Sequence, residues 1–143
     1  MPKPDPALLD PRRYPFTCRI EPRFGDLDVN LHINNVAMAS LLEEAHVRFH
    51  RVSGYHARQA GLSSMVASVT IDYLREASYP DPIEIHIAAE HMGRTSHVLA
   101  KLATQGEHAI AFSRTVIVTV GAEGPVPLPG SFVEQAEQWT LRA

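Results

Sequence analysis

The hydrophobic pattern changes its period along this 143-residue chain, and that change limits the folds open to it. From Met38 to Val52, apolar residues recur every three or four positions, which predicts one face of a helix ending before Gly54. Residues 16–20 instead alternate apolar with polar side chains, as a half-buried strand does. Four later segments alternate in the same way and are rich in β-branched residues: 65–74, 83–91, 96–104 and 109–120.

Short turn sequences separate the later strands. Pro80-Asp81-Pro82, Met92-Gly93 and Gln105-Gly106-Glu107 favour antiparallel neighbours over helical crossovers. We therefore predict an α+β domain in which a curved antiparallel sheet of about five strands wraps one long central helix. Val36 and Ser40 make the first turns of that helix only weakly polar, so we expect them to be covered on most sides.

The length and composition fit one globular domain. The chain is 45% hydrophobic and 20% charged, and 143 residues are too few for two ordinary domains. Residues 1–15 hold five prolines and predict an extended lead-in, which leaves a single domain over 16–143. Residues 131–139 predict a short terminal helix. One sheet and one helix leave apolar sheet surface to cover, so we expect self-association as a homodimer or homotetramer.

Charge and targeting features argue against several classes of protein. A net charge of -3 lacks the basic excess that nucleic-acid binding needs. No apolar run is long enough to cross a membrane, and the first residues have no apolar signal core. Cys18 is the single cysteine, so it cannot form a disulfide within the chain. It lies on the apolar side of its predicted strand, as a core residue would. We expect a cytoplasmic protein that binds neither nucleic acid nor membrane.

A polar loop, residues 25–35, directly precedes the predicted helix. Its carboxylate Asp28 lies beside the helix start, where an anion is favoured, and could act as a nucleophile or a general base. A structural alternative is that Asp28 caps the helix or a turn. Asp26 is the better candidate for a purely structural role. Asn34 or Asn35 is the expected N-cap, and the free backbone amides near them could stabilise an oxyanion.

Several segments together resemble one known family. They are Arg23–Asp28, His32–Asn35, Leu42–Ala45, Ile71–Ala77 and Gly93–Ser96. Over roughly residues 16–128 the chain resembles the hotdog-fold thioesterases, the 4-hydroxybenzoyl-CoA thioesterase-like acyl-CoA hydrolases. The order from Asp28 to His32, with Ser63–Met65 and Arg75-Glu76 downstream, is also similar to the catalytic half of plant acyl-ACP thioesterases. The resemblance implies hydrolysis of an acyl-CoA, or of an acyl-ACP, without a metal or redox cofactor.

The resemblance also implies roles for individual residues. Asp28 would be the base or nucleophile, while Asn30 and His32 would orient it or the water and polarise the thioester carbonyl. Glu76 matches a catalytic glutamate of the acyl-ACP enzymes, which many of the CoA hydrolases lack. Structural alternatives are a turn conformation at Asn30, a backbone hydrogen bond from His32 and a solvated charge at Glu76. Arg75 and Arg94 would bind the CoA phosphates, although either could be a solvated surface arginine.

Three alternative functions can be weighed against this interpretation. The first is metal binding, because a helix carries Glu43, His46 and His50 at the spacing of metal ligands. No second cluster supplies the remaining ligands, so we predict no metal site.

A hotdog enoyl-thioester hydratase also uses Asp, Asn and His. Its motif places the histidine five residues after the aspartate, whereas His32 follows Asp28 by four and no Pro-Ile pair precedes it. The third alternative is a non-catalytic module that binds acyl thioesters.

Overall fold

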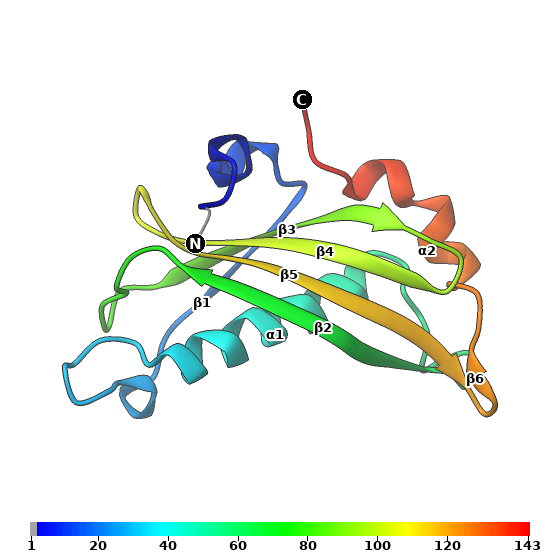
Figure 1. Cartoon of the computed structure of the whole chain (residues 1–143), viewed down its shortest axis with the longest axis horizontal. Coiled ribbons are helices and arrows are strands. Elements are labelled where there is room, and N and C mark those ends of the chain that lie inside the picture. The colour runs from blue at the N-terminus through cyan, green and yellow to red at the C-terminus, as the bar shows by residue number, and fades with distance from the viewer. Residues whose placement is uncertain (1–2) are drawn as a thin grey trace.

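A computed structural model describes residues 3–143 (Figure 1). Its five long strands are β1 (Phe16–Ile20), β2 (Ser63–Tyr73), β3 (Ile83–Met92), β4 (Ser96–Gln105) and β5 (His108–Gly121). They form one antiparallel sheet in the order β1-β3-β4-β5-β2, and the short β6 (Gly124–Pro125) pairs with β5. The sheet curls over one long helix, α1 (Asn35–Val52), as predicted (Figure 1).

The prediction that consecutive strands are neighbours is wrong for β2 and β3. β2 pairs with β5, and β3 lies between β1 and β4. The segment 74–82 carries the chain across the end of the sheet instead of closing a hairpin (Figure 1). This crossing leaves β2 as an edge strand, and none of its 11 residues is buried.

The main core lies between the concave face of the sheet and α1. Met38, Leu42, Ala45 and Phe49 pack from the helix against isoleucines of β3 and against Leu99. The helix ends at Val52, with Ser53 as its C-cap, and Gly54 follows with φ +84°. A side chain there would meet Ser131 and Gln135, which explains the glycine at the predicted end.

The first turns of α1 are less covered than predicted. Val36 and Ser40 are exposed in the single chain, as is Val47 further along. The sheet covers one face of the helix only, and the side toward the β2 edge stays open.

The lead-in and the C-terminal segment meet on the outside of the sheet, where the Arg142 amide donates to the Arg13 carbonyl at 2.7 Å. The lead-in is not extended as predicted, because residues 6–9 and 11–13 form two short 3-10 helices. The side chains of Asp5 and Asp10 cap these helices. Tyr14 and the leucines of this segment pack on a second cluster on the convex face, around Leu102 and Phe112. The expected terminal helix is present as α2 (Gly130–Glu134) and a 3-10 turn (Ala136–Trp139). Within the described range, no helix has both the length and the apolar character to cross a membrane.

Candidate active site

The loop before α1 curls back on itself from Asp28 to His32. The Asp28 amide donates to the His32 carbonyl (2.9 Å), and the Leu31 amide donates to the Asp28 carbonyl (3.1 Å). Leu31 takes the left-handed conformation, with φ +62°, which is uncommon for leucine. The unusual turn conformation thus falls on Leu31, not on Asn30. These bonds hold the loop in the curled form that convergence of its side chains requires.

The Asp28 carboxylate is held by its own loop. Oδ1 accepts hydrogen bonds from the backbone amides of Asn30 (2.8 Å) and His32 (3.1 Å). No partner for Oδ2 is found among residues 3–143. Asp28 caps this turn and not the helix, because the helix cap is Asn34, whose Oδ1 accepts from the Val36 amide (2.7 Å). One carboxylate oxygen is fixed while the other is free to meet a ligand.

A hydrogen bond between the loop and the segment that follows β2 brings a distant glutamate to the loop. The Ile33 amide donates to the Ala77 carbonyl at 3.0 Å. His32 Nε2 consequently lies 3.2 Å from Glu76 Oε2. Glu76 is a charge at a strand end, as the structural alternative had it, with 75% of its side chain exposed, yet it contacts the predicted histidine.

These groups line one cavity of about 400 Å³ at the start of α1. Its walls include Asp28, Asn30, His32 and Glu76, the four side chains to which the resemblance assigns chemistry. Asn30 is exposed, and its side chain makes no hydrogen bond within the described structure. The side chains of Asp28 and His32 are thus more buried than that of Asn30 and make contacts that Asn30 lacks.

The two arginines expected at the CoA phosphates lie apart. Arg75 lines the cavity, with Nη1 2.8 Å from His108 Nδ1. Arg94 is in the turn between β3 and β4, at the end of the sheet where β2 begins, and its carbonyl accepts from the Leu128 amide. The whole length of β2 separates Arg94 from Glu76. Within one chain, Arg94 is therefore not part of this site.

Only one of the two expected oxyanion donors is free. The Asn34 amide donates to the Asp26 carbonyl (2.8 Å), so the prediction is wrong for Asn34: the loop itself uses this donor. For the Asn35 amide, no acceptor is found in the part of the chain that the structure describes. Tyr73, which the sequence interpretation missed, donates from its hydroxyl to the Asn35 carbonyl at 2.8 Å and lines the cavity. Its alternation with Ile71 was the one signal that it faces the helix.

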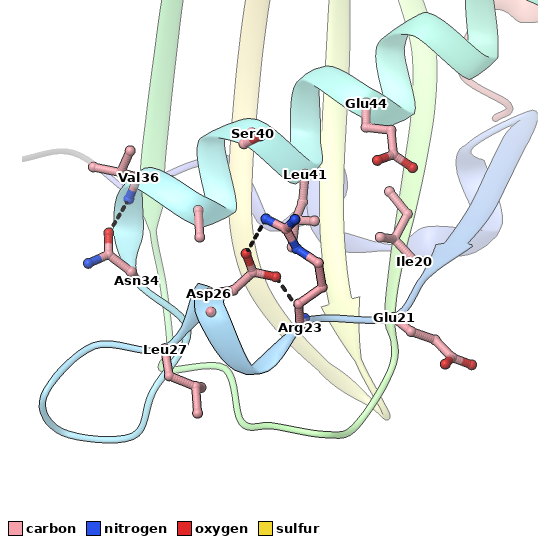
Figure 2. A pocket seen from close by; sticks show the side chains of 12 residues that line it. Ile20, Glu21, Arg23, Asp26, Leu27, Asn34, Val36, Ser40, Leu41 and Glu44 are labelled. Carbon is pink, nitrogen blue, oxygen red and sulfur yellow. Dashed lines mark hydrogen bonds and ion pairs between the residues drawn. The ribbon is translucent and has the colours of Figure 1, made fainter.

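Asp26 has a structural role on the other side of the loop (Figure 2). It is buried and accepts from the Arg23 amide (2.7 Å) and from Arg23 Nη2 (3.1 Å). Burial alone would raise the pKa of Asp26, but the hydrogen bonds from Arg23 outweigh it and lower the pKa. Figure 2 shows this pair and Asn34 among the residues that line a separate cavity. Its volume is about 660 Å³. This cavity is larger than the one beside Asp28, but its carboxylate, Asp26, is already bonded to Arg23.

The helical histidines do not form a metal site with Glu43. His46 and His50 point into the core, whereas Glu43 is exposed. Over residues 3–143, no group of three His, Cys, Asp or Glu side chains has the arrangement of metal ligands.

Comparisons with known proteins agree with this fold. A thioesterase from Thermus thermophilus, solved with coenzyme A and zinc, is 27% identical, with a TM-score of 0.77 over 87% of this chain and 93% of that chain. The PA2801 protein of Pseudomonas aeruginosa is 26% identical, with a TM-score of 0.76 over 82% and 95% of the two chains. The PA5185 protein of Pseudomonas aeruginosa PAO1, at 21% identity, shares the fold, with a TM-score of 0.83 over 92% and 96%. No curated protein matched the chain.

A family model decides the membership. The model of the thioesterase-like superfamily matches residues 22–136, which include the loop, α1 and all of β2 to β5. The chain therefore belongs to the thioesterase-like superfamily, and its curled sheet around one long helix is the hotdog fold.

Proposed function

We propose that this protein hydrolyses acyl-CoA thioesters to a free acid and CoA, with Asp28 as the essential group. The observation that carries the proposal is the cavity at the start of α1, which holds a fixed carboxylate, a histidine contacting Glu76, and the free Asn35 amide. The similar Thermus protein was solved with coenzyme A, which supports CoA as the carrier.

Asp28 is positioned to act through its free oxygen. In one route, Asp28 Oδ2 takes a proton from a water molecule, whose oxygen attacks the thioester carbonyl. In the other, Asp28 itself attacks, the CoA thiolate leaves, and water then hydrolyses the mixed anhydride that has formed. Label found in Asp28 after a single turnover in ¹⁸O-labelled water would establish the second route, because water attacking the aspartyl carbonyl leaves its oxygen in Asp28.

The neighbouring groups assist at the carbonyl and at the leaving thiolate. The Asn35 amide at the helix start donates to the oxygen that gains charge. The Tyr73 hydroxyl donates to the carbonyl of the same residue and so ties the helix start to the end of β2. His32 and Glu76 form a pair that can move a proton toward the departing sulfur. The side chain of Asn30 reaches into the same cavity and hydrogen-bonds water or substrate.

We also propose a homodimer that completes the site through β2. The edge of β2 offers unpaired backbone groups together with the exposed side chains of Met65, Val66 and Val69. Two copies that pair β2 antiparallel bring the beginning of one strand beside the end of the other. The Arg94 end of each sheet then approaches the Asp28 end of the other copy, where it can bind CoA phosphates. Light scattering should give a dimer mass, or a multiple of it, and Val69→Lys should shift the mass toward the monomer.

A thiol-release assay across acyl chain lengths and aromatic CoA thioesters tests the activity. We expect release of CoA from at least one class, with no metal added. Addition of water to crotonyl-CoA without thiol release would indicate a hydratase instead. Tight binding of acyl-CoA without either reaction would indicate a binding module.

A further inference from the structure

A second cavity, also of about 400 Å³, lies next to the first in the groove between α1 and β2. Valines and Ile71 of β2 form an apolar wall, and the inner surface is the concave face of β4 and β5. Three buried polar side chains of that face line this cavity: Lys101, Ser113 and Thr115. Lys101 is directly opposite Ser113 in the sheet, and Thr115 is the next residue of β5 on the same face.

The two hydroxyls are buried without partners. Ser113 and Thr115 are 1% and 2% exposed, and neither Ser113 Oγ nor Thr115 Oγ1 has a hydrogen bond to any described residue. Leaving a buried hydroxyl unpaired is unfavourable in a core that could hold alanine and valine instead. Both residues line the wall of the cavity, where a bound ligand would supply the missing hydrogen-bond partner.

Lys101 is a buried cation without a carboxylate. It is 2% exposed, and among residues 3–143 its ammonium has a single hydrogen-bond contact, with His46, whose Nδ1 lies 3.4 Å from Lys101 Nζ. Burial lowers the pKa of Lys101 to about 8, so most of it stays charged at neutral pH, and burial lowers the pKa of His46 to about 3, so that imidazole is neutral. Glu43 lies at the exposed rim, and no acidic oxygen in residues 3–143 lies within salt-bridge distance of Lys101.

The two cavities follow one another along the same elements. Asn35 lines the first and Glu43 the second, eight helical residues further on, a rise of about 12 Å. Tyr73 and Ile71 lie on the same face of β2, two residues apart. Tyr73 lines the first cavity, and Ile71 lines the second cavity. An acyl chain whose thioester lies at the helix start can therefore run along the groove toward Lys101.

We infer that the acyl group of the substrate ends in a carboxylate, bound by Lys101 with Ser113 and Thr115, so that the substrate is a dicarboxylic acyl thioester. This inference rests on the proposed function and names its substrate class. A carboxylate has two oxygens that accept charge-assisted bonds, one from the ammonium and others from the hydroxyls. It supplies the partner that each of the three side chains lacks.

Matched pairs of CoA esters test the inference. Octanoyl-CoA is compared with octanedioyl-CoA, and the shorter and longer pairs are treated in the same way, with wild type and Lys101→Met. We expect wild type to prefer the diacid ester at one or more lengths, and the ratio of kcat/KM to fall roughly tenfold to a hundredfold in Lys101→Met, mainly through KM. Lys3→Met is the control: Lys3 is the only other lysine, is exposed, and should leave the ratio unchanged.

Binding of the free acids distinguishes failure of this inference from failure of the proposed hydrolysis. Calorimetry with octanedioate and octanoate needs no turnover, and methionine in place of an unpaired buried charge should not prevent folding. If no thioester is cleaved but octanedioate binds wild type more tightly than it binds Lys101→Met, the anion site stands and the hydrolase does not. If thioesters are cleaved but Lys101→Met leaves the preference unchanged, or if wild type prefers the monoacid at every length, the inference is wrong and the hydrolase stands.

Discussion

The two cavities of the groove differ in how their polar groups are satisfied. At the helix start, Asp28 and His32 are bonded within their own loop and to the end of β2. In the middle of the groove, Lys101, Ser113 and Thr115 lie on two strands and have almost no partners in the chain. The first set is held in place whether or not a ligand is bound. The second set gains most of its hydrogen bonds only when a ligand supplies them.

The largest effect expected from this contrast is at Asp28. Asp28→Asn should lower kcat by roughly a hundredfold to ten-thousandfold, because the amide can neither take a proton nor attack. The fold should persist, since the amide oxygen can still accept from Asn30 and His32. Asp72→Asn, on the opposite face of β2, is the matched control in the same thiol-release assay. Wild-type turnover by Asp28→Asn would contradict the role of the loop.

The buried histidines near Lys101 should make the protein acid-sensitive. Burial lowers the pKa of His50 to about 2, of His46 to about 3 and of His97 to about 4, from 6.5. The unfolded chain then binds more protons than the folded one below pH 6.5. The free energy of unfolding should therefore keep its full value above pH 6.5 and decrease as the pH falls toward 4. The decrease is up to ~1.4 kcal/mol per pH unit for each histidine.

Thermal unfolding followed across this pH range measures the effect. His56→Gln, which changes an exposed histidine, should keep the same profile. A flat profile down to pH 4 would show that these imidazoles are not buried in the neutral form.

Lys101→Met should stabilise the free protein while it weakens selection of the diacid. Burial lowers the pKa of Lys101 from 10.5 to about 8, so Lys101 is still mostly charged at neutral pH, and burying this charge costs free energy on folding. Removing this charge should raise the free energy of unfolding by ~2 kcal/mol. The advantage should vanish above pH 10.5, where lysine is neutral in both states. Denaturant titration with Lys3→Met as the control measures it, and a less stable Lys101→Met would argue that Lys101 is satisfied within the chain.

The smallest effect is expected at Glu76. Because its side chain is largely exposed, Glu76→Gln should change the free energy of unfolding by less than about 0.5 kcal/mol. The loss of the negative charge beside His32 should lower kcat about fivefold. Glu107→Gln, another exposed glutamate in a turn, should change neither quantity. Unchanged kcat in Glu76→Gln would leave Glu76 as a surface charge.

Periodicity and turn residues predicted the elements because both are local. The ends of α1 agree with the polar loop before it and with Gly54 after it, and the five strands lie within a few residues of their predicted positions. The site loop could be read in the same way, since Asp28, Asn30 and His32 are neighbours in the chain. The order of the strands could not be predicted in this way, because the crossing at 74–82 has turn residues like those of a hairpin. The position of β3 in the sheet depends on its contacts with β1 and β4.

Local sequence patterns were enough to predict one helix, five strands, a curled sheet and a carboxylate-containing loop at the helix start. Three features of the site depend on contacts between distant segments: Glu76 reaches His32, the Asn34 amide bonds to Asp26, and Arg94 lies at the far end of the sheet. Tertiary structure also brought Lys101, Ser113 and Thr115 together under α1. The physical reason is that period and turn chemistry act over a few residues, whereas contact across strands depends on the register and order of the whole sheet.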